Sequence, residues 1–248
     1  MNPARITLAL LLLCTAPVFA KAPTQLIYLT PGSVNVETLL PPPPTPGSPA
    51  NNADIRAVLA HQHSRNAIQV LRARSEVNLS PAAFDDVLGP WFTAANLPHT
   101  FTLLNNASHD SEAISQSAKN LWNRPRPPYQ DLNVNPVVQV PTTPSYPSGH
   151  STRAALWASI LSELAPDAKQ TLLARGAQIG QDRVIAGVHF PSDVAAGQLL
   201  GHTIAARLLA TPKFQHDLAI ARPEFNAARP TTAVMLPIFT FHHFSATQ

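Results

Sequence analysis

Residues 145–164, SYPSGHSTRAALWASILSEL, combine a helix-start signal with a long helical pattern. Ser148 is of a type favoured at helix N-caps. Apolar residues follow at the i, i+3, i+4 and i+7 spacing of a buried helix face: Trp157, Ile160, Leu161 and Leu164. The stretch therefore predicts a core helix that begins at Ser148. It also places a titratable side chain, His150, in the first turn of this helix. Gly149, which precedes it, has a low helix propensity and weakens that turn, so its presence there needs an explanation.

Helical patterns dominate the chain on both sides of this stretch. One is predicted to begin at Asn52 and run through HQHSRNAIQVLRARSE. Another is predicted to begin at His109, with Asp110 and Glu112 as the acidic residues of its first turn, and to run to Asn123, where Arg-Pro-Arg-Pro ends it. Further helices are predicted to start at Pro166 and at Pro191, and residues 128–146 are predicted to form a loop. Strand-like alternation is scarce, so the sequence predicts an all-α, single-domain helical bundle with an extended Pro-rich N-terminal arm.

Composition narrows the range of partners. The chain has 248 residues, of which 45% are hydrophobic and 12% charged, and its formal net charge is +3. This mild excess, without a Lys/Arg block, argues against nucleic-acid binding and favours small anionic substrates at most. Thirteen of the seventeen basic residues are Arg, which suits fixed contacts to oxyanions.

The first 22 residues, MNPARITLALLLLCTAPVFAKA, have the form of a secretory signal, with cleavage expected after Ala20 or Ala22. An uncleaved anchor is the alternative. We therefore expect a signal peptide at 1–20, an arm at 21–52, a helical domain at 53–248, and a periplasmic or secreted location with no membrane segment in the mature form. The only cysteine, Cys14, lies in the signal, so the mature chain has neither a disulfide nor a thiolate nucleophile.

Three groups of residues carry the candidate chemistry. They are Lys119 with Arg126; Ser148, Gly149 and His150; and Arg183, His189 and Asp193. An N-cap at Ser148 directs free N–H groups outward, and Gly149 lets an oxyanion approach them closely. The three cations suit the three oxygens of a phosphoryl group in transfer. Access for an anion thus explains the glycine in the first turn.

The two histidines have different surroundings and therefore suit different tasks. A carboxylate at Asp193 can bind one nitrogen of His189 and leave the other as a nucleophile. His150 would then be the general acid that protonates a leaving alkoxide and later activates water.

Together the three groups resemble the signature of the type 2 phosphatidic acid phosphatase superfamily, which also includes vanadium haloperoxidases. The segments LLPPPPTPGS, SYPSGHSTRAALWA and RVIAGVHFPSDVAAG are similar to those of the class A bacterial non-specific acid phosphatases, and the likeness extends from about Leu39 to Leu209. The resemblance implies an all-helical, metal-independent phosphomonoesterase that uses no cofactor and works through a phosphohistidine.

The resemblance also implies a role for each residue. His189 is the nucleophile, His150 the proton donor and Asp193 the group that orients His189. Lys119, Arg126, Arg183, Ser148 and Gly149 bind the phosphoryl oxygens. One position departs from the family, which usually has Ser where this chain has Asp182, and we expect this carboxylate to weaken phosphate binding or shift the pH optimum.

Several residues beside these motifs are not assigned to the site. Arg124 and Arg153 flank the signature and are interpreted as structural or rim residues. The histidines at 61, 63, 242 and 243 are interpreted as non-ligands, because a metal site needs a convergent third group.

The function predicted from the sequence is thus acid phosphatase activity on small phosphomonoesters, with phosphotransfer to alcohols as a side activity. Two alternatives stay open: a vanadate-dependent haloperoxidase, and a non-catalytic exported protein that binds phosphate or phosphoesters. A homo-oligomer also stays open, since the apolar residues near Met235 could pack in a dimer or against the domain.

Overall fold

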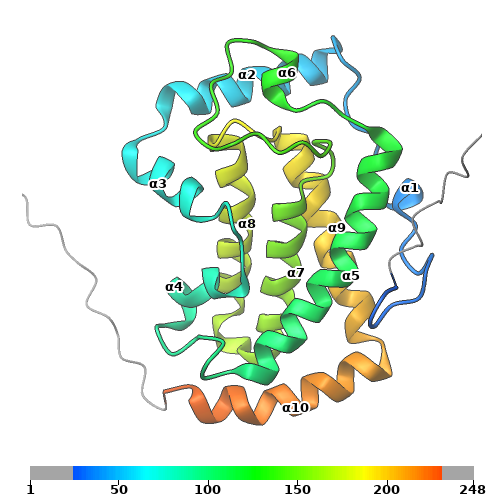
Figure 1. Ribbon diagram of the computed structural model, residues 1–248, viewed down its shortest axis with the longest axis vertical. Helices are drawn as coiled ribbons and strands as arrows, with labels where there is room; N and C mark the ends of the chain where they lie inside the picture. The colour runs from blue at the N-terminus through cyan, green and yellow to red at the C-terminus, as the bar shows by residue number, and fades with distance from the viewer. Residues whose placement is uncertain (1–24, 231–248) are drawn as a thin grey trace, which may run out of the picture.

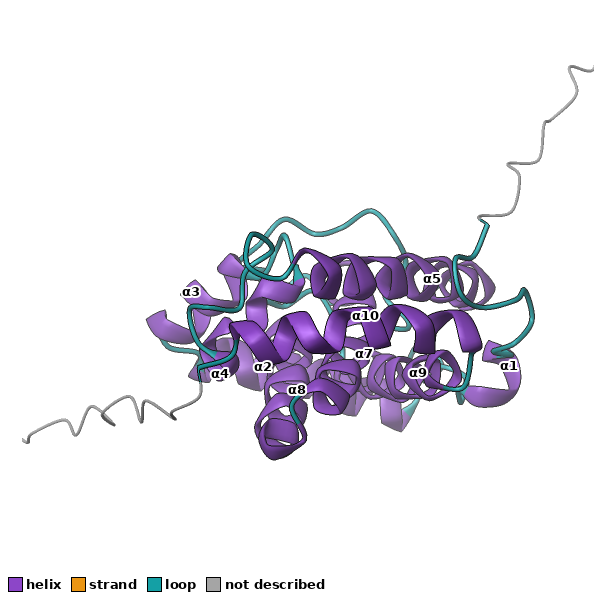
Figure 2. Cartoon of the chain, turned by 90° about the horizontal axis from the view of Figure 1, so that it is seen from below, coloured by secondary structure: helices purple, strands orange, loops and turns teal. Residues whose placement is uncertain are grey.

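The computed structural model describes residues 25–230. The predicted signal peptide and the apolar segment near Met235 lie outside the described residues. Over residues 25–230 the chain forms helices joined by loops, with no strand (Figure 2). This confirms the predicted all-α fold class.

Three helices form the centre of the bundle. They are α7 (Gly149–Leu164), α8 (Lys169–Ile185) and α9 (Pro191–Leu209). Helix α7 packs against both of the others, and α5 (Pro98–Trp122) and α10 (Pro212–Ala228) complete the core around it (Figure 1). Because α7 touches every one of these helices, its residues are buried on nearly all sides.

The remaining elements are shorter or lie outside this centre. They are α1 (Val36–Leu39), α2 (Pro49–Ser64), α3 (Ala67–Ser75), a 3₁₀ turn at Pro81–Phe84, α4 (Asp85–Leu88), α6 (Pro127–Gln130) and a 3₁₀ turn at Pro166–Ala168. Helices α2 and α3 pack on α8, at the end of the bundle where α7 and α9 begin (Figure 1).

The helix predicted from the opening stretch is confirmed. Ser148 is the N-cap of α7, and its hydroxyl accepts a hydrogen bond from the backbone N–H of Ser151. The whole predicted apolar stripe is buried, and Trp157 also donates its indole N–H to the carbonyl oxygen of Leu104 at 3.1 Å. Pro191 is the first residue of α9, as its fixed φ predicts.

Two of the predicted helices have wrong boundaries. The helix predicted from Asn52 begins at Pro49 and stops at Ser64, because Asn66 and Gln69 form a capping box that starts α3. The helix predicted from His109 begins at Pro98 instead. The acidic residues there, which suggested a first turn, lie in mid-helix.

One of those acidic residues, Asp110, binds the N-terminal segment. Its buried carboxylate accepts the backbone N–H groups of Ile27, Tyr28 and Leu29 at 2.6, 2.9 and 2.9 Å. Residues 27–29 are therefore held against α5, and within residues 25–48 α1 is the only helix. The predicted division into arm and domain at residue 52 stays a prediction.

Helices α7 and α9 approach very closely at the end that carries the sequence motifs. A Cβ added to Gly197 of α9 would lie 2.5 Å from the carbonyl oxygen of Ser148 and 2.8 Å from Cβ of Ser151. The backbone N–H of Ser148 also donates to the carbonyl oxygen of Asp193 at 2.9 Å. This contact fixes the start of α7 against the start of α9.

We therefore predict that Gly197→Ala lowers the free energy of unfolding by about 1–3 kcal/mol, because the added methyl group must displace the backbone of α7. Urea denaturation measures this. Ala206→Ser, on the exposed face of the same helix, is the control and should change stability by less than about 0.5 kcal/mol. Equal stability of both variants would show that the helices separate at no cost.

Candidate active site

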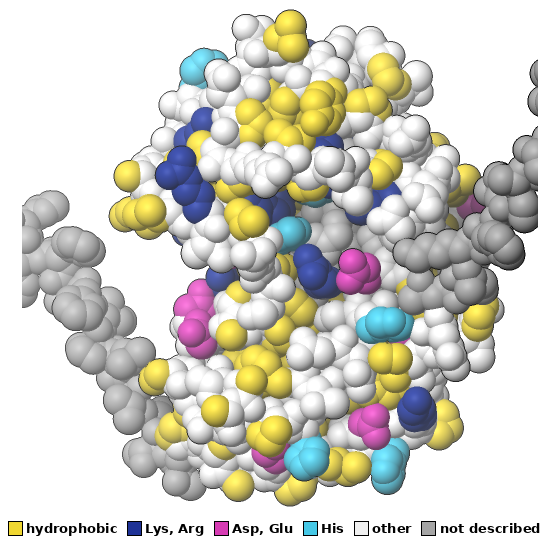
Figure 3. All heavy atoms as spheres, viewed as in Figure 1, with side chains coloured by type: hydrophobic (Ala, Val, Ile, Leu, Met, Phe, Trp, Pro, Cys, Tyr) yellow, Lys and Arg dark blue, Asp and Glu magenta, His cyan; other side chains and the backbone are white. Residues whose placement is uncertain are grey.

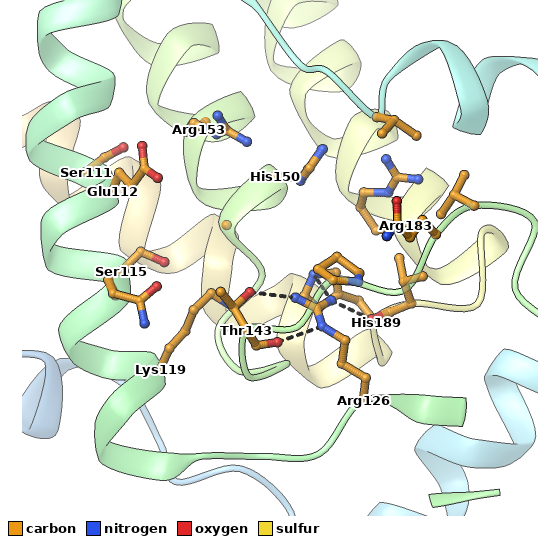
Figure 4. Close-up of a pocket in the computed structure, with 17 residues that line it drawn as sticks. Ser111, Glu112, Ser115, Lys119, Arg126, Thr143, His150, Arg153, Arg183 and His189 are labelled. Atoms are coloured by element: carbon orange, nitrogen blue, oxygen red, sulfur yellow. Dashed lines mark hydrogen bonds between the residues drawn. The ribbon is translucent and has the colours of Figure 1, made fainter. Parts of the chain in front are cut away.

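A pocket of about 210 Å³ lies where α5, α7 and α8 meet the loops that follow α6 and α8. Six of the predicted site residues line it: Lys119, Arg126, Gly149, His150, Arg183 and His189 (Figure 4). The other two, Ser148 and Asp193, are fully buried beneath it. Basic, acidic and histidine side chains also gather in the middle of the face that Figure 3 shows. The structure thus brings all eight residues together.

His189 is held from one side by a buried carboxylate. Its Nδ1 lies 3.3 Å from Oδ2 of Asp193, and the same oxygen accepts the backbone N–H of Phe190 at 2.9 Å. The hydroxyl of Ser145 donates to Oδ2 as well, at 2.5 Å. A carboxylate can only accept, so the proton of neutral His189 belongs on Nδ1 and the lone pair on Nε2.

The lone pair of His189 faces the cations of the pocket. Nη1 of Arg126 donates to Nε2 at 3.0 Å, which identifies Nε2 as the acceptor (Figure 4). Burial lowers the pKa of His189, the bond to Asp193 opposes that change, and Arg126 lowers it again, so the net pKa lies well below its usual range. The ring therefore stays neutral in acid, with Nε2 free of a proton.

Three cations line the pocket with their orientations fixed by backbone carbonyl groups. Nζ of Lys119 donates to the carbonyl oxygen of Pro144 at 2.6 Å. Arg126 donates to the carbonyl oxygens of Thr143 and Val188 at 2.8 and 2.9 Å, and Arg183 to that of Ala73 at 2.9 Å.

Burial and mutual repulsion disfavour the charged forms of these three side chains. Burial and the charge of Arg126 lower the pKa of Lys119 to about 7, although Asp193 opposes this. Burial also lowers the pKa of Arg126 to about 10, and that of Arg183 below its usual value. Nε of Arg183 is buried without a partner among the described residues. An anion in the pocket would relieve each of these costs.

His150 lies on α7 opposite this group of cations. Its Nε2 is 3.0 Å from the carbonyl oxygen of Glu76, which can only accept, so Nε2 carries a proton and Nδ1 is the nitrogen that can gain one. Burial, followed by the charges of Arg183 and Arg153, holds the pKa of His150 well below its ordinary value.

Arg124, interpreted from the sequence as a structural or rim residue, is a buried neighbour of Asp193. Its side chain is buried, at 4% exposed, and Nη1 donates to Oδ1 of Asp193 at 2.6 Å. Nη2 donates to Oδ2 of Asp54 at 2.8 Å and to Asn51 at 3.1 Å. Nothing in the spacing of the signature could reveal this role, because Asp54 comes from α2 and meets Arg124 only in the folded chain.

Asp182, the departure from the family pattern, does not line the pocket. Its buried carboxylate accepts Nε and Nη2 of Arg72 at 2.6 and 2.8 Å, and Nε2 of Gln178 at 3.1 Å. The charge is thus paired with α3, behind Arg183. Burial lowers the pKa of Arg183, and the charges of Glu76 and Asp182 oppose this change. The expected effect of Asp182 on phosphate binding or on the pH optimum stays a prediction.

Arg153, by contrast, is one of the residues that line the pocket (Figure 4). Among residues 25–230, no group of three or more His, Cys, Asp or Glu side chains is arranged to hold a metal ion. None of the described helices is both long and apolar enough to cross a membrane.

Comparison with known proteins identifies the family. Residues 100–217 match the model of the PAP2 superfamily, and these residues include all eight predicted site residues. A non-specific acid phosphatase of Salmonella typhimurium is 34% identical over 203 residues, which cover 78% of this chain and 81% of that protein. The chain belongs to the non-specific acid phosphatases of the PAP2 superfamily. This confirms the predicted resemblance.

Further comparisons agree with the family and with the fold. The non-specific acid phosphatase of Salmonella typhi is 32% identical over 231 residues, covering 90% of this chain and 92% of that one. Among solved structures, a bacterial vanadium-dependent iodoperoxidase shares the fold with a TM-score of 0.52 at 16% identity, over 73% of this chain and 52% of that one.

We predict that Arg124→Gln lowers the free energy of unfolding by about 3–5 kcal/mol, because it leaves two buried carboxylates, Asp54 and Asp193, without their cation. Arg229→Gln is the matched control: it breaks an exposed pair with Asp167 and should cost less than about 1 kcal/mol. Denaturant titration compares the two. Similar losses in both variants would show that the Arg124 pair adds nothing beyond a surface ion pair.

Proposed function

We propose that this acid phosphatase hydrolyses small phosphomonoesters without a metal ion, through a covalent phosphohistidine on His189. The observation that carries the proposal is the position of Nε2 of His189, unprotonated and facing a pocket with three fixed cations. Membership of the non-specific acid phosphatases supports the reaction class. Export to the periplasm or the medium, through the predicted signal peptide, is part of the same proposal.

The first step forms the intermediate. Nε2 of His189 attacks phosphorus, and the bond between phosphorus and the leaving oxygen breaks. The proton on His150 moves to that oxygen, so the product leaves as an alcohol. Arg126, which donates to Nε2 in the free site, must exchange this bond for bonds to the phosphoryl oxygens.

The second step releases phosphate. Neutral His150 takes a proton from water while the water oxygen attacks phosphorus, and the bond between phosphorus and Nε2 breaks. His189 and protonated His150 are thereby restored. An alcohol in place of water would give phosphotransfer by the same steps.

The charge of the substrate makes this acid–base role of His150 feasible. Burial and the neighbouring arginines disfavour protonated His150 in the free site. A phosphoryl dianion close to the same arginines offsets their repulsion and raises the pKa of His150. We therefore expect His150 to gain its proton together with substrate, and to do so more readily in acid.

The test is turnover of para-nitrophenyl phosphate from pH 4 to 8 in the presence of EDTA. We expect activity on the acid side that survives chelation, and a loss of at least about 10³-fold in His189→Ala. His202→Ala, an exposed histidine of α9, is the control and should keep wild-type activity. Substrate with a radioactive phosphoryl group is mixed rapidly with the enzyme, and the reaction is quenched in base. The label should stay on the wild-type protein but not on His189→Ala.

The alternatives predict other results. Loss of activity with EDTA would contradict metal independence. Turnover that persists in His189→Ala would mean that another group is the nucleophile. If the wild-type protein has no phosphatase activity but oxidises halide with peroxide when loaded with vanadate, it is a haloperoxidase. If it has neither activity and only binds phosphate, it is the non-catalytic alternative.

Lys119 gives a separate prediction about pH. Its lowered pKa, about 7, means that the free enzyme carries this positive charge below pH 7 and loses it above. We expect kcat/KM to fall more steeply above about pH 7 than below, and kcat to show this change less, because bound phosphate holds the proton on Lys119. In Lys119→Arg the charge persists, so the steeper fall should disappear. An unchanged profile in that variant would falsify this role.

A further inference from the structure

The pocket extends beyond the residues that would hold the phosphoryl group. A second set of residues lines it farther from Lys119 and Gly149, and we call this set the outer wall: Ser111, Glu112, Ser115 and Gln116 of α5, and Arg153 of α7 (Figure 4). The mechanism proposed above uses none of them. At about 30 Å³ per water molecule, the pocket of about 210 Å³ has room for a phosphoryl group and a small leaving group.

Arg153 is the fourth cation of the pocket and differs from the other three. Lys119, Arg126 and Arg183 each donate to at least one backbone carbonyl. Arg153 makes neither a hydrogen bond nor an ion pair with any residue from 25 to 230, although it is partly buried. Its guanidinium therefore retains its donors for a ligand.

Helix geometry sets the distance of Arg153 from the phosphate site. Arg153 follows Gly149 by four residues, so both lie on one face of α7, about 6 Å apart along the helix axis. Because helical side chains lean toward the helix N-terminus, a group bound by Arg153 would lie within about one helical turn of the phosphoryl group. That is the length of a short leaving group.

The facing helix repeats this spacing. Ser115 precedes Lys119 by four residues and shares its face of α5, again about 6 Å along the axis. Ser115 is only 3% exposed, and its hydroxyl oxygen has no hydrogen-bond partner among the described residues. A buried hydroxyl without a partner is costly, and a ligand in the pocket would supply one.

Glu112 is the acidic neighbour of this region. It is the only carboxylate in the lining, it is exposed, and it lies about two turns from Lys119 on α5. Burial lowers the pKa of Arg153, and the charge of Glu112 opposes that change. Glu112 therefore offsets part of the attraction of Arg153 for a second anion, while the hydrogen-bond donors of the guanidinium stay available.

We propose that Arg153 and Ser115 form a leaving-group subsite that selects phosphomonoesters whose alcohol carries a second anionic group, a carboxylate or a phosphate, about one helical turn away. This inference rests on the proposed function, since it concerns the leaving group of the same reaction. A guanidinium binds either oxyanion through paired hydrogen bonds, and a serine hydroxyl can donate a further one.

The test compares substrates that differ only in this second group. The carboxylate pair is 3-phosphoglycerate and glycerol 3-phosphate, and the phosphate pair is propane-1,3-diol bisphosphate and 3-hydroxypropyl phosphate. We expect the wild-type enzyme to prefer the more anionic member of at least one pair by about tenfold in kcat/KM. The pair that shows the preference identifies the anion.

Variants assign the preference to Arg153. Arg153→Gln should reduce the ratio of kcat/KM within the preferred pair to near one, Arg153→Lys should keep part of it, and Ser115→Ala should reduce it less. Arg207→Gln removes the same charge from an exposed position on α9 and should keep the wild-type ratio. The ratio is insensitive to a general loss of active protein, so partial misfolding of a variant does not obscure the result.

Three outcomes would overturn the subsite: no preference in either wild-type pair, a ratio unchanged by Arg153→Gln, or an equal loss in Arg207→Gln. Failure of the proposed function looks different. A wrong mechanism is detected by the EDTA and His189→Ala experiments, which do not depend on the second anionic group. A protein without phosphatase activity would leave glycerol 3-phosphate and 3-hydroxypropyl phosphate, which need no second anion site, unhydrolysed as well.

Discussion

The buried carboxyl group of Asp193 is the contact on which the geometry of the site depends. Its two oxygens accept hydrogen bonds from Arg124, Ser145 and the backbone of Phe190, and Oδ2 also faces Nδ1 of His189. Its own backbone carbonyl accepts the N–H of Ser148 at the start of α7. One residue thus orients one histidine and joins the helix that carries the other.

The electrostatics of the pocket follow from placing several cations where little water reaches them. Lys119, Arg126 and Arg183 repel one another, and burial disfavours each charge. Fixed carbonyl groups orient these side chains but supply no negative charge. The free site is therefore poised for an anion. Burial first, and then the nearby cations, hold the pKa values of His150 and His189 below their usual range.

The residues that line the site could be predicted from the sequence, but the buried residues that hold them in position could not. Ser148 and Pro191 marked two helix starts by local chemistry alone, and the residues of the signature do meet in one pocket. Arg124 and Ser145 could not be recognised as hydrogen-bond donors to the carboxylate of Asp193, because Asp193 is distant from both in the sequence. The predicted start of α5 at His109 was wrong for a related reason. The acidic residues that looked like a first turn include Asp110, which serves a distant segment.

The way Asp110 is used has a consequence for how far the chain can be shortened. Its carboxylate is buried, and it takes hydrogen bonds from three consecutive backbone N–H groups at residues 27–29. Proteolytic trimming past residue 26 would leave a buried negative charge without these donors in the core helix α5. The interior of the fold therefore limits how far the N-terminus of this protein can be shortened.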